Sequence, residues 1–263
     1  MFLFGKPRSA WAPPLLIAGT GGSGTRVFTL LARDLGYFMG AHVNEFQDAQ
    51  DTAAFIARWQ DRLLPGQPPC TPREQKTMQR DFDSALRRHR SGIPRAEAAW
   101  GYKNPRAIFL LPTLMDLFPG TSFLHVVRDG LDMAFSDNQG QLDAFGAAWL
   151  DPASEGLPRP MRSALLWARV NAKAADLGES KLGPRYLRIR FEDLCAEPDR
   201  CLSQLEAFTT RRFEGLRTQA LGRIQAPLSL GRGRRQDPAL GAQVLAACGD
   251  ARLRFGYVPP AAD

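Results

Sequence analysis

A glycine-rich segment near the N-terminus has the residue types that bind a phosphate-like anion. Residues 15–18 form a short apolar run, and residues 19–24 (Gly-Thr-Gly-Gly-Ser-Gly) separate it from a helix-like pattern. Glycines let backbone N–H groups approach an anion closely, and a helix dipole favours negative charge at its N-terminus. The Gly-Lys-Ser/Thr ending of nucleoside triphosphatases is missing, because Gly22 stands where the lysine would be. We predict an anion-binding loop whose usual cation comes from elsewhere in the chain.

Three further segments place charged or polar side chains at the ends of apolar runs. They are residues 103–106 (Lys-Asn-Pro-Arg), 128–136 (Arg-Asp-Gly-Leu-Asp-Met-Ala-Phe-Ser) and 192–194 (Glu-Asp-Leu). In parallel sheets, ligands bind beyond the carboxyl ends of the strands. If the apolar runs are parallel strands, these side chains and the glycine loop meet at one edge of the sheet.

The elements that must position these residues alternate between strand and helix patterns. Strands are expected at residues 15–18, 100–103, 122–127 and 186–191, and helices at 24–35, 52–63, 73–90, 106–117, 131–138, 161–177, 198–208 and from Asp237-Pro238 toward Cys248. Residues 139–160 have the glycine and proline content of a loop. This alternation predicts a single α/β domain over residues 1–263, with its core at about 15–257 and helices on both faces of a central parallel sheet.

Composition narrows the classes of protein to which the chain belongs. The chain has 34 basic and 27 acidic residues and a net charge of +7, which suits an anionic ligand. The charge is scattered and no nucleic-acid motif is present, so we expect no nucleic-acid partner. Four cysteines without a CxxC pair favour reduced thiols in the cytoplasm, with no metal site. No apolar run is long enough to span a membrane, and residues 1–14 lack the apolar core of a signal peptide.

The motifs, in this order, resemble those of the sulfotransferases that use 3′-phosphoadenosine 5′-phosphosulfate (PAPS). In that family a Ser-Gly-Thr loop binds the 5′-phosphosulfate, and residues 21–26 (Gly-Gly-Ser-Gly-Thr-Arg) match it. A family arginine at a strand end and a serine eight residues later bind the 3′-phosphate, and Arg128 and Ser136 have this spacing. Residues 190–194 (Arg-Phe-Glu-Asp-Leu) are similar to a third family segment, and residues 231–235 (Gly-Arg-Gly-Arg-Arg) to its basic loop over the donor.

The resemblance runs from about residue 15 to 257 and is strongest to a bacterial branch. That branch combines the loop at 21–26 with Asn-Glu-x-x-Asp, here residues 44–48, and Lys-Asn-Pro, here residues 103–105. It implies a P-loop nucleotide-kinase-like sulfotransferase fold and transfer of a sulfuryl group from PAPS to a hydroxyl or amine. The implied product is 3′-phosphoadenosine 5′-phosphate (PAP), and no metal takes part.

The resemblance also assigns roles to individual residues. Lys103 is the expected catalytic cation, acting on the bridging oxygen or the moving sulfuryl group. Either Lys103 or Arg26 replaces the cation that Gly22 does not supply. The expected donor contacts are Gly21, Gly22, Ser23, Gly24, Thr25, Arg26, Arg128, Ser136, Arg232, Gly233 and Arg234.

The acceptor needs a general base within hydrogen-bond reach. Some relatives place a histidine just after the lysine, but here Asn104 occupies that position and cannot act as a base. Other relatives use a glutamate downstream of the first helix, where Glu45 and Asp48 lie. We favour Glu45 over Asp48 as the base, and His42 is a third candidate.

Two other functions compete with sulfuryl transfer. A small-molecule P-loop kinase would use the same loop, but the missing Gly-Lys-Ser/Thr speaks against it. A non-catalytic module binding an anion or a nucleic acid would explain the positive charge alone. For a sulfotransferase, the expected partner is a small-molecule, glycan or lipid acceptor, and no oligomeric state is predicted. Among the remaining histidines, His89 is expected on a solvated helix face and His125 in the core.

Overall fold

Four strands form one parallel sheet in the order β2-β1-β3-β4. The computed structural model describes residues 11–93, 95 and 98–258, and its strands are β1 (Leu15–Ala18), β2 (Gly101–Lys103), β3 (Ser122–Val127) and β4 (Tyr186–Arg190). β1 lies in the middle, with Leu16 paired to Tyr102 on one side and to Phe123 on the other. All four β1 residues are buried, as expected for a strand covered on both faces. The predicted parallel sheet is confirmed, and each strand lies within one residue of its predicted bounds.

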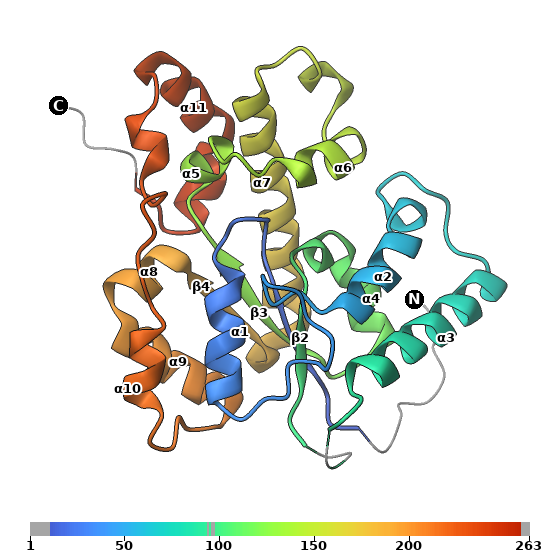
Figure 1. Ribbon diagram of the computed structural model, residues 1–263. Coiled ribbons are helices and arrows are strands. Elements are labelled where there is room, and N and C mark those ends of the chain that lie inside the picture. The colour runs from blue at the N-terminus through green and yellow to red at the C-terminus, as the bar shows by residue number, and fades with distance from the viewer. Residues whose placement is uncertain (1–10, 94, 96–97, 259–263) are drawn as a thin grey trace.

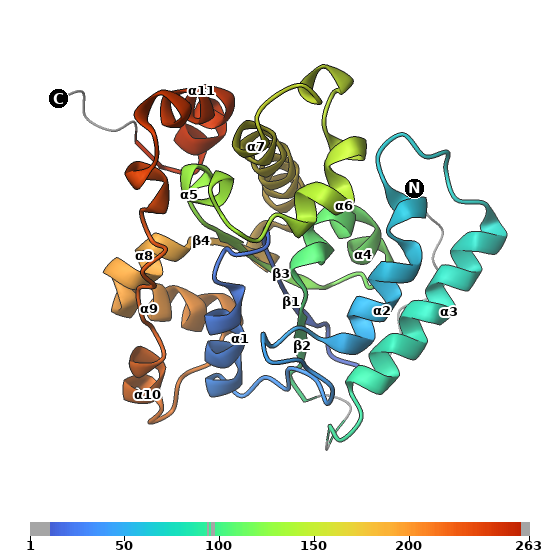
Figure 2. The same cartoon turned by 45° about the horizontal axis from the view of Figure 1, so that its top comes forward.

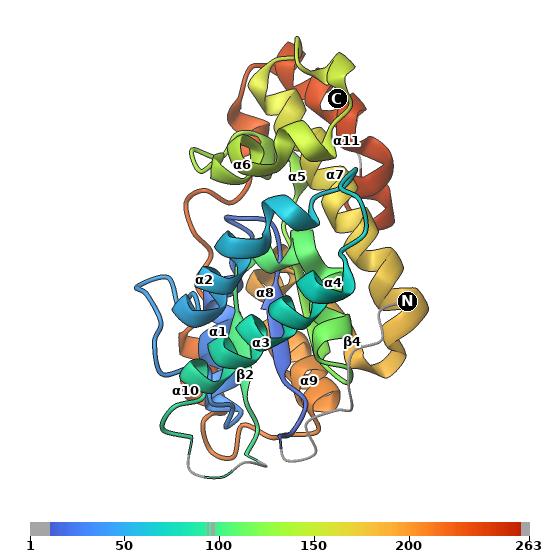
Figure 3. The ribbon, with the colours of Figure 1, turned by 90° about the vertical axis from the view of Figure 1, so that its right-hand side faces the viewer.

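Helices cover both faces of this sheet, as Figures 1, 2 and 3 show. One face carries α1 (Thr25–Asp34), α8 (Phe191–Ala196), α9 (Pro198–Thr209) and α10 (Arg217–Gly222). The other carries α2 (Gln50–Trp59), α3 (Pro72–His89), α4 (Leu111–Leu117) and α7 (Arg159–Leu177). Side chains alternate along β1, so that Leu15 and Ile17 join the first apolar core while Leu16 and Ala18 join the second.

A third group of elements lies over the carboxyl ends of the strands, at the top of Figure 1. It consists of α5 (Gly130–Ala134), α6 (Gly140–Trp149) and α11 (Pro238–Arg254). Leu131, Trp167 and Val244 join α5, α7 and α11 in a small separate core. Short 3₁₀ segments lie at 61–63, 105–110, 152–154, 183–185 and 232–235, and a π-helical turn lies at 178–182. The edge of the sheet that was expected to bind a ligand is therefore covered by its own layer.

Helix starts follow the capping pattern of the sequence. Asp237 accepts a hydrogen bond from the Leu240 amide at 2.8 Å and starts α11 at Pro238, where the Asp-Pro pair predicts it. At the start of α3, the Thr71 hydroxyl accepts from the Glu74 amide, and the Glu74 carboxylate accepts from the Thr71 amide. This reciprocal capping box fixes the helix start within one residue of the predicted bound.

Two expectations for residues 131–160 were wrong. The helix expected at 131–138 ends at Ala134, because the side-chain amide of Gln139 donates to the carbonyls of Met133 and Ala134 at 3.2 and 3.3 Å. These bonds satisfy carbonyls that have no partner at a helix end. The expected loop at 139–160 contains α6, whose Phe145 ring stacks on Phe109 with centroids 4.0 Å apart. Tertiary packing thus overrides the glycine content of this segment.

The predicted environment is confirmed for His125 but not for His89. His125 is fully buried, as expected, between the Tyr186 hydroxyl and the Asn171 side-chain oxygen, each 2.9 Å away. The expectation of a solvated His89 was wrong, because its ring lies 2.8 Å from the Gly101 carbonyl and directly under Gly40. A Cβ on Gly40 would lie 2.2 Å from the His89 ring, so the close approach of this loop buries the histidine.

Burial of His125 makes the fold sensitive to acid. Desolvation lowers the pKa of His125 to about 4, from an ordinary value of 6.5. Between these values the unfolded chain binds a proton that the folded chain does not, so the free energy of unfolding falls as pH falls. We expect His125 to account for a loss of about 2 kcal/mol between pH 7 and pH 5, since one pKa unit corresponds to about 1.4 kcal/mol.

Urea unfolding of His125→Gln and wild type at both pH values measures this loss. The variant is expected to show the smaller pH dependence. His42→Gln serves as the control for the loss of an exposed histidine, because the His42 side chain is 61% exposed. Equal pH dependence in all three proteins would show that His125 does not titrate in this way.

No helix in the described residues is long and apolar enough to cross a membrane. Residues 1–10, most of the segment in which we expect no signal peptide, lie outside the described residues.

Candidate active site

The glycine loop joins β1 to α1 and is held by contacts that only glycine permits. A Cβ on Gly19 would lie 2.2 Å from the Val126 carbonyl oxygen, and a Cβ on Gly24 would lie 2.2 Å from the Phe191 ring. Gly22 and Gly24 have φ of +92° and +85°, in the left-handed region that favours glycine. Phe191 therefore packs beneath the loop. Gly24 is the N-cap residue of α1, and it has no side chain to cover the helix N-terminus.

The hydroxyl of Ser23 stabilises the loop from inside. It donates to the Thr20 carbonyl at 2.5 Å and lies 3.0 Å from the Thr20 hydroxyl, and Ser23 is fully buried. The structure thus places this side chain within the turn, and the Ser23 amide is paired there as well, with the Thr20 carbonyl at 3.0 Å. Thr25 begins α1. Arg26, on the first turn of α1, is exposed. This is the geometry of a helix N-terminus that can receive an oxyanion.

Lys103 lies at the end of β2, beside the strand that leads into the loop. It is only 2% exposed, and its ammonium donates to the Phe46 carbonyl at 2.6 Å and to the Asp48 carboxylate. Burial lowers the pKa of Lys103, the ion pair with Asp48 opposes that shift, and the charge of Arg26 adds to it. A buried cation at this strand end acts more strongly on a nearby negative charge than one in water.

The segment 44–48 holds Lys103 in place. The Asn44 side-chain oxygen accepts from the amides of Phe46 and Asp48 at 3.0 and 2.8 Å, and the Asn44 amide group donates to the Asp48 carboxylate at 3.3 Å. Asp48 is therefore oriented toward Lys103, whereas Glu45 is exposed at the tip of the segment. Sequence reasoning gave Asn44 no role, although its position four residues before Asp48 was visible in the Asn-Glu-x-x-Asp motif.

Arg128 and Ser136 both lie beside Gly22. Arg128 is 3% exposed, and its guanidinium donates to the Gly22 carbonyl at 3.4 Å. The Ser136 hydroxyl lies 3.7 Å from the position of a Cβ on Gly22. An unbroken helix would separate residues eight apart by about 12 Å. Because α5 ends at Ala134, the chain turns back and brings the two side chains to the same part of the loop.

The basic loop, residues 231–235, brings a second arginine to this cluster. Arg128 donates to the carbonyl and hydroxyl of Ser229, and Arg232 donates to the same carbonyl at 3.3 Å. Burial lowers the pKa of Arg232, and the neighbouring charge of Arg128 lowers it further. Two guanidinium groups held this closely repel each other, so the position favours a bound polyanion.

A match to a family model identifies the chain. The model of the sulfotransferase family matches residues 14–215. The chain belongs to the sulfotransferase family. No curated protein matches its sequence significantly. This membership favours sulfuryl transfer over the kinase and the non-catalytic binding module.

Solved structures show that the fold is that of sulfotransferases. The sulfotransferase domain from the curacin biosynthetic pathway is 14% identical, with a TM-score of 0.55 over 95% of this chain and 100% of that one. The sulfotransferase domain of the Synechococcus PCC 7002 olefin synthase is 16% identical, with a TM-score of 0.55 over 95% and 96%. A sulfotransferase from Alicyclobacillus acidocaldarius is 18% identical, with a TM-score of 0.51 over 91% and 95%.

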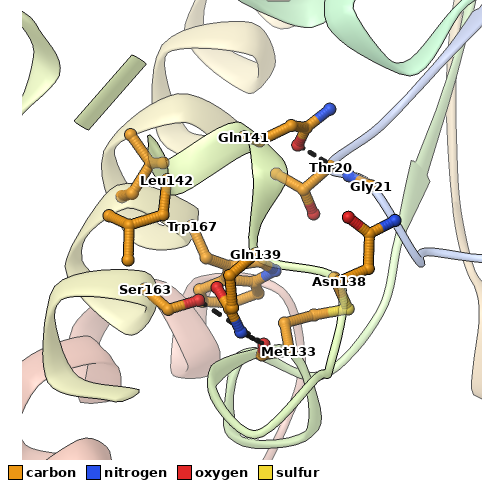
Figure 4. Close-up of a pocket in the computed structure, with 10 residues that line it drawn as sticks. Thr20, Gly21, Met133, Asn138, Gln139, Gln141, Leu142, Ser163 and Trp167 are labelled. Carbon is orange, nitrogen blue, oxygen red and sulfur yellow. Dashed lines mark hydrogen bonds between the residues drawn. The ribbon is translucent and has the colours of Figure 1, made fainter. Parts of the chain in front are cut away.

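Helix α6 lies against the glycine loop of this sulfotransferase. Figure 4 shows the Gln141 side chain reaching from α6 to the loop, where its oxygen accepts from the Gly21 amide at 2.7 Å. Beside this contact, the loop, Met133 and Trp167 line a cavity of about 30 Å³. The Trp167 indole donates to the Arg128 carbonyl at 2.9 Å and fixes the end of β3. The Gly21 amide is therefore already paired, unlike an amide waiting for a ligand.

Arg234 lies apart from the other expected donor contacts. It lines a cavity of about 380 Å³ together with Glu192, Arg252 and Tyr257. Arg252 pairs with both oxygens of Asp129 at 2.7 and 3.0 Å, and burial raises the pKa of Glu192. The structure thus places Arg232 beside Arg128, and Arg234 in a neighbouring space. In the described part of the chain, no group of three or more potential ligand side chains could hold a metal ion.

Proposed function

We propose that this sulfotransferase transfers a sulfuryl group from PAPS to a hydroxyl or amine, releasing PAP. One observation carries the proposal: the glycine loop, the buried Lys103 and the Arg128–Arg232 pair meet at one edge of the sheet. Lys103 lies at the end of a different strand from the arginine pair. Two separate positive positions suit a ligand with two separate anionic groups, such as the 5′-phosphosulfate and the 3′-phosphate of PAPS. The domain extends over the whole chain, with its core at about residues 15–257.

An unpaired atom supports the fit of the donor. Nε of Arg128 is buried and has no hydrogen-bond partner within the residues that the structure describes. A buried donor without an acceptor costs about 1–3 kcal/mol, so a phosphate oxygen reaching it would relieve that cost. We assign Arg128, Ser136 and Arg232 to the 3′-phosphate of PAPS, while Gly233 holds the basic loop beside them through the bond from its amide to Asp132. The loop residues Gly21 to Thr25, together with Arg26, surround the 5′-phosphosulfate, and Arg234 contributes positive potential from the neighbouring cavity.

The residues of this chain divide the reaction between them. The donor supplies a sulfuryl group whose bond to the bridging oxygen breaks as the acceptor oxygen or nitrogen bonds to sulfur. The amides at the start of α1 hold the leaving 5′-phosphate, and Lys103 stabilises the negative charge that grows on the bridging oxygen. Arg26 adds positive potential from the exposed side and shares the task of the missing loop cation. Glu45 accepts the acceptor's proton, while Asp48 orients Lys103.

Replacing Glu45 with glutamine tests this division of roles. Because glutamine cannot take the proton, we expect kcat to fall about 10²-fold, with the affinity for PAP unchanged. The contrasting variant is Asp48→Asn, which frees Lys103 and should alter its pKa without removing the base. Initial rates with a saturating acceptor, recorded over a range of pH, measure the loss of the base in the first variant and the changed pKa of Lys103 in the second. A wild-type rate in Glu45→Gln would transfer the role of base to Asp48 or His42.

The acceptor itself is found by a transfer assay. Purified protein is incubated with sulfur-labelled PAPS and separate panels of sugars, phenols, amines and lipids, and labelled products are resolved by chromatography. We expect one panel to become labelled, which assigns the acceptor to a small molecule, a glycan or a lipid. Lys103→Ala is the control for enzymatic transfer. The four cysteines are free thiols, which supports the cytoplasm as the place of this activity.

A further inference from the structure

A buried carboxylate joins the two halves of the arginine cluster. Asp132 on α5 is 4% exposed, and one of its oxygens accepts from Arg128 at 3.1 Å. The same oxygen accepts from the Gly231 amide at 2.7 Å, and the other oxygen accepts from the Gly233 amide at 2.9 Å. Asp132 is therefore the link between the end of β3 and the basic loop, which lies about a hundred residues further along the chain.

The basic loop needs two glycines, Gly233 because the loop rests closely on α5 and Gly231 because of its backbone conformation. A Cβ on Gly233 would lie 2.5 Å from the Leu131 side chain and 2.8 Å from its backbone. Gly231 has φ of +72°, a conformation that side chains disfavour. These two glycines are the residues whose amides reach Asp132. The close packing of the loop on α5 and its hydrogen bonds to the Asp132 carboxylate therefore hold the loop in the same position.

This position determines where the arginines point. Ser229, two residues before the basic loop, accepts from both Arg128 and Arg232, so the two guanidinium groups are brought to one carbonyl. Asp132 balances only one of their two charges, which leaves a net positive charge for an anion. Without Asp132, neither the loop nor the Arg128 side chain would have its charged partner, and mutual repulsion would separate the arginines.

We propose that Asp132 is a positioning residue that pre-assembles the 3′-phosphate site, and so determines the preference for PAP over adenosine 5′-phosphate. This inference rests on the proposed function. Asp132 itself does not touch the nucleotide, because its two oxygens are held by protein donors. Its effect on binding passes through Arg128 and the basic loop. A pre-assembled site avoids the ordering of a loop and two arginine side chains when the ligand arrives.

The isosteric variant Asp132→Asn isolates this role. Asparagine keeps the shape of the side chain, but it has a single acceptor oxygen and no charge, so its amide group faces N–H donors. We expect the affinity for PAP to fall at least tenfold and the affinity for adenosine 5′-phosphate to change by less than threefold. We define the 3′-phosphate preference as the dissociation constant of adenosine 5′-phosphate divided by that of PAP. We expect this ratio to fall at least tenfold in the variant. A general loss of stability would weaken both ligands together.

Calorimetric titration of the full-length protein with PAP and adenosine 5′-phosphate measures this preference. If Asp132→Asn does not fold, Gly233→Ala replaces it, because its Cβ lifts the loop from α5 without changing any charge. Gly249→Ala is the matched control, since nothing lies within 4 Å of a Cβ there, and it should keep the wild-type preference.

The outcomes separate the inference from the function on which it rests. A wild-type preference above tenfold that collapses in the variant supports the role of Asp132. A wild-type preference that persists within threefold in the folded variant overturns that role and leaves the proposed function standing. A wild-type protein with no preference for PAP overturns the proposed function, and this inference with it.

Discussion

Replacing Lys103 with alanine is expected to lower kcat by about 10²–10³-fold while changing the affinity for PAP by less than threefold. Removal of one preorganised charge-stabilising group from an active site has this magnitude. Lys103 is buried at the end of β2, next to β1, so water replaces its ammonium poorly. Lys103 stabilises the transition state more than the ground state, because negative charge grows on the bridging oxygen only as the bond to sulfur breaks. Its loss should therefore lower kcat and not the affinity for PAP.

The measurement is the initial rate of PAP release with a saturating acceptor, alongside a titration with PAP. Lys76→Ala is the matched control, because Lys76 is exposed on α3 and should leave both values unchanged. The loss of Lys103 also leaves the Asp48 carboxylate without its cation, and thermal unfolding of each variant separates that effect from catalysis. An unchanged rate in a folded Lys103→Ala would remove the assigned role.

Arg128→Ala is expected to weaken PAP binding by about 10²-fold and to leave adenosine 5′-phosphate binding nearly unchanged. A charge-assisted hydrogen bond contributes about 1.5–3 kcal/mol, so the loss of one or two such bonds to a phosphate gives a factor of this size. The guanidinium is already held by Gly22, Asp132 and Ser229, so little ordering is needed on binding.

Two further variants make this result specific. Arg128→Lys keeps the charge but not the planar fork, so it should recover only part of the affinity. Arg73→Ala removes an exposed arginine from α3 and should bind both nucleotides as wild type does. Calorimetry on all four proteins gives the comparison. If Arg128→Ala weakened the two nucleotides equally, the assignment of Arg128 to the 3′-phosphate would be wrong.

The sheet could be predicted from the sequence because its signals are local. Four of the six residues of β3 are apolar, in two pairs on either side of His125, which is typical of a strand buried on both faces. The rule that ligands bind beyond the carboxyl ends of parallel strands then predicts that Lys103, Arg128 and the glycine loop lie at the same edge of the sheet.

The parts that escaped prediction depend on contacts between distant segments. Gln139 ends α5 through bonds to backbone carbonyls, and no propensity rule signals that. His89 is buried because Gly40, about fifty residues earlier, lies against its ring. The sequence favoured Glu45 over Asp48 as the base but gave no contact that separates them, and in the structure Asp48, not Glu45, pairs with Lys103.

We infer that this sulfotransferase binds a 3′-phosphorylated adenine nucleotide, and a calorimetric comparison of four ligands decides whether it does. The wild-type protein is titrated separately with PAP, adenosine 5′-phosphate, ATP and a DNA oligonucleotide. We expect PAP to bind at least tenfold more tightly than each of the other three. Tight binding of ATP, with no dependence on the 3′-phosphate, would contradict the claim.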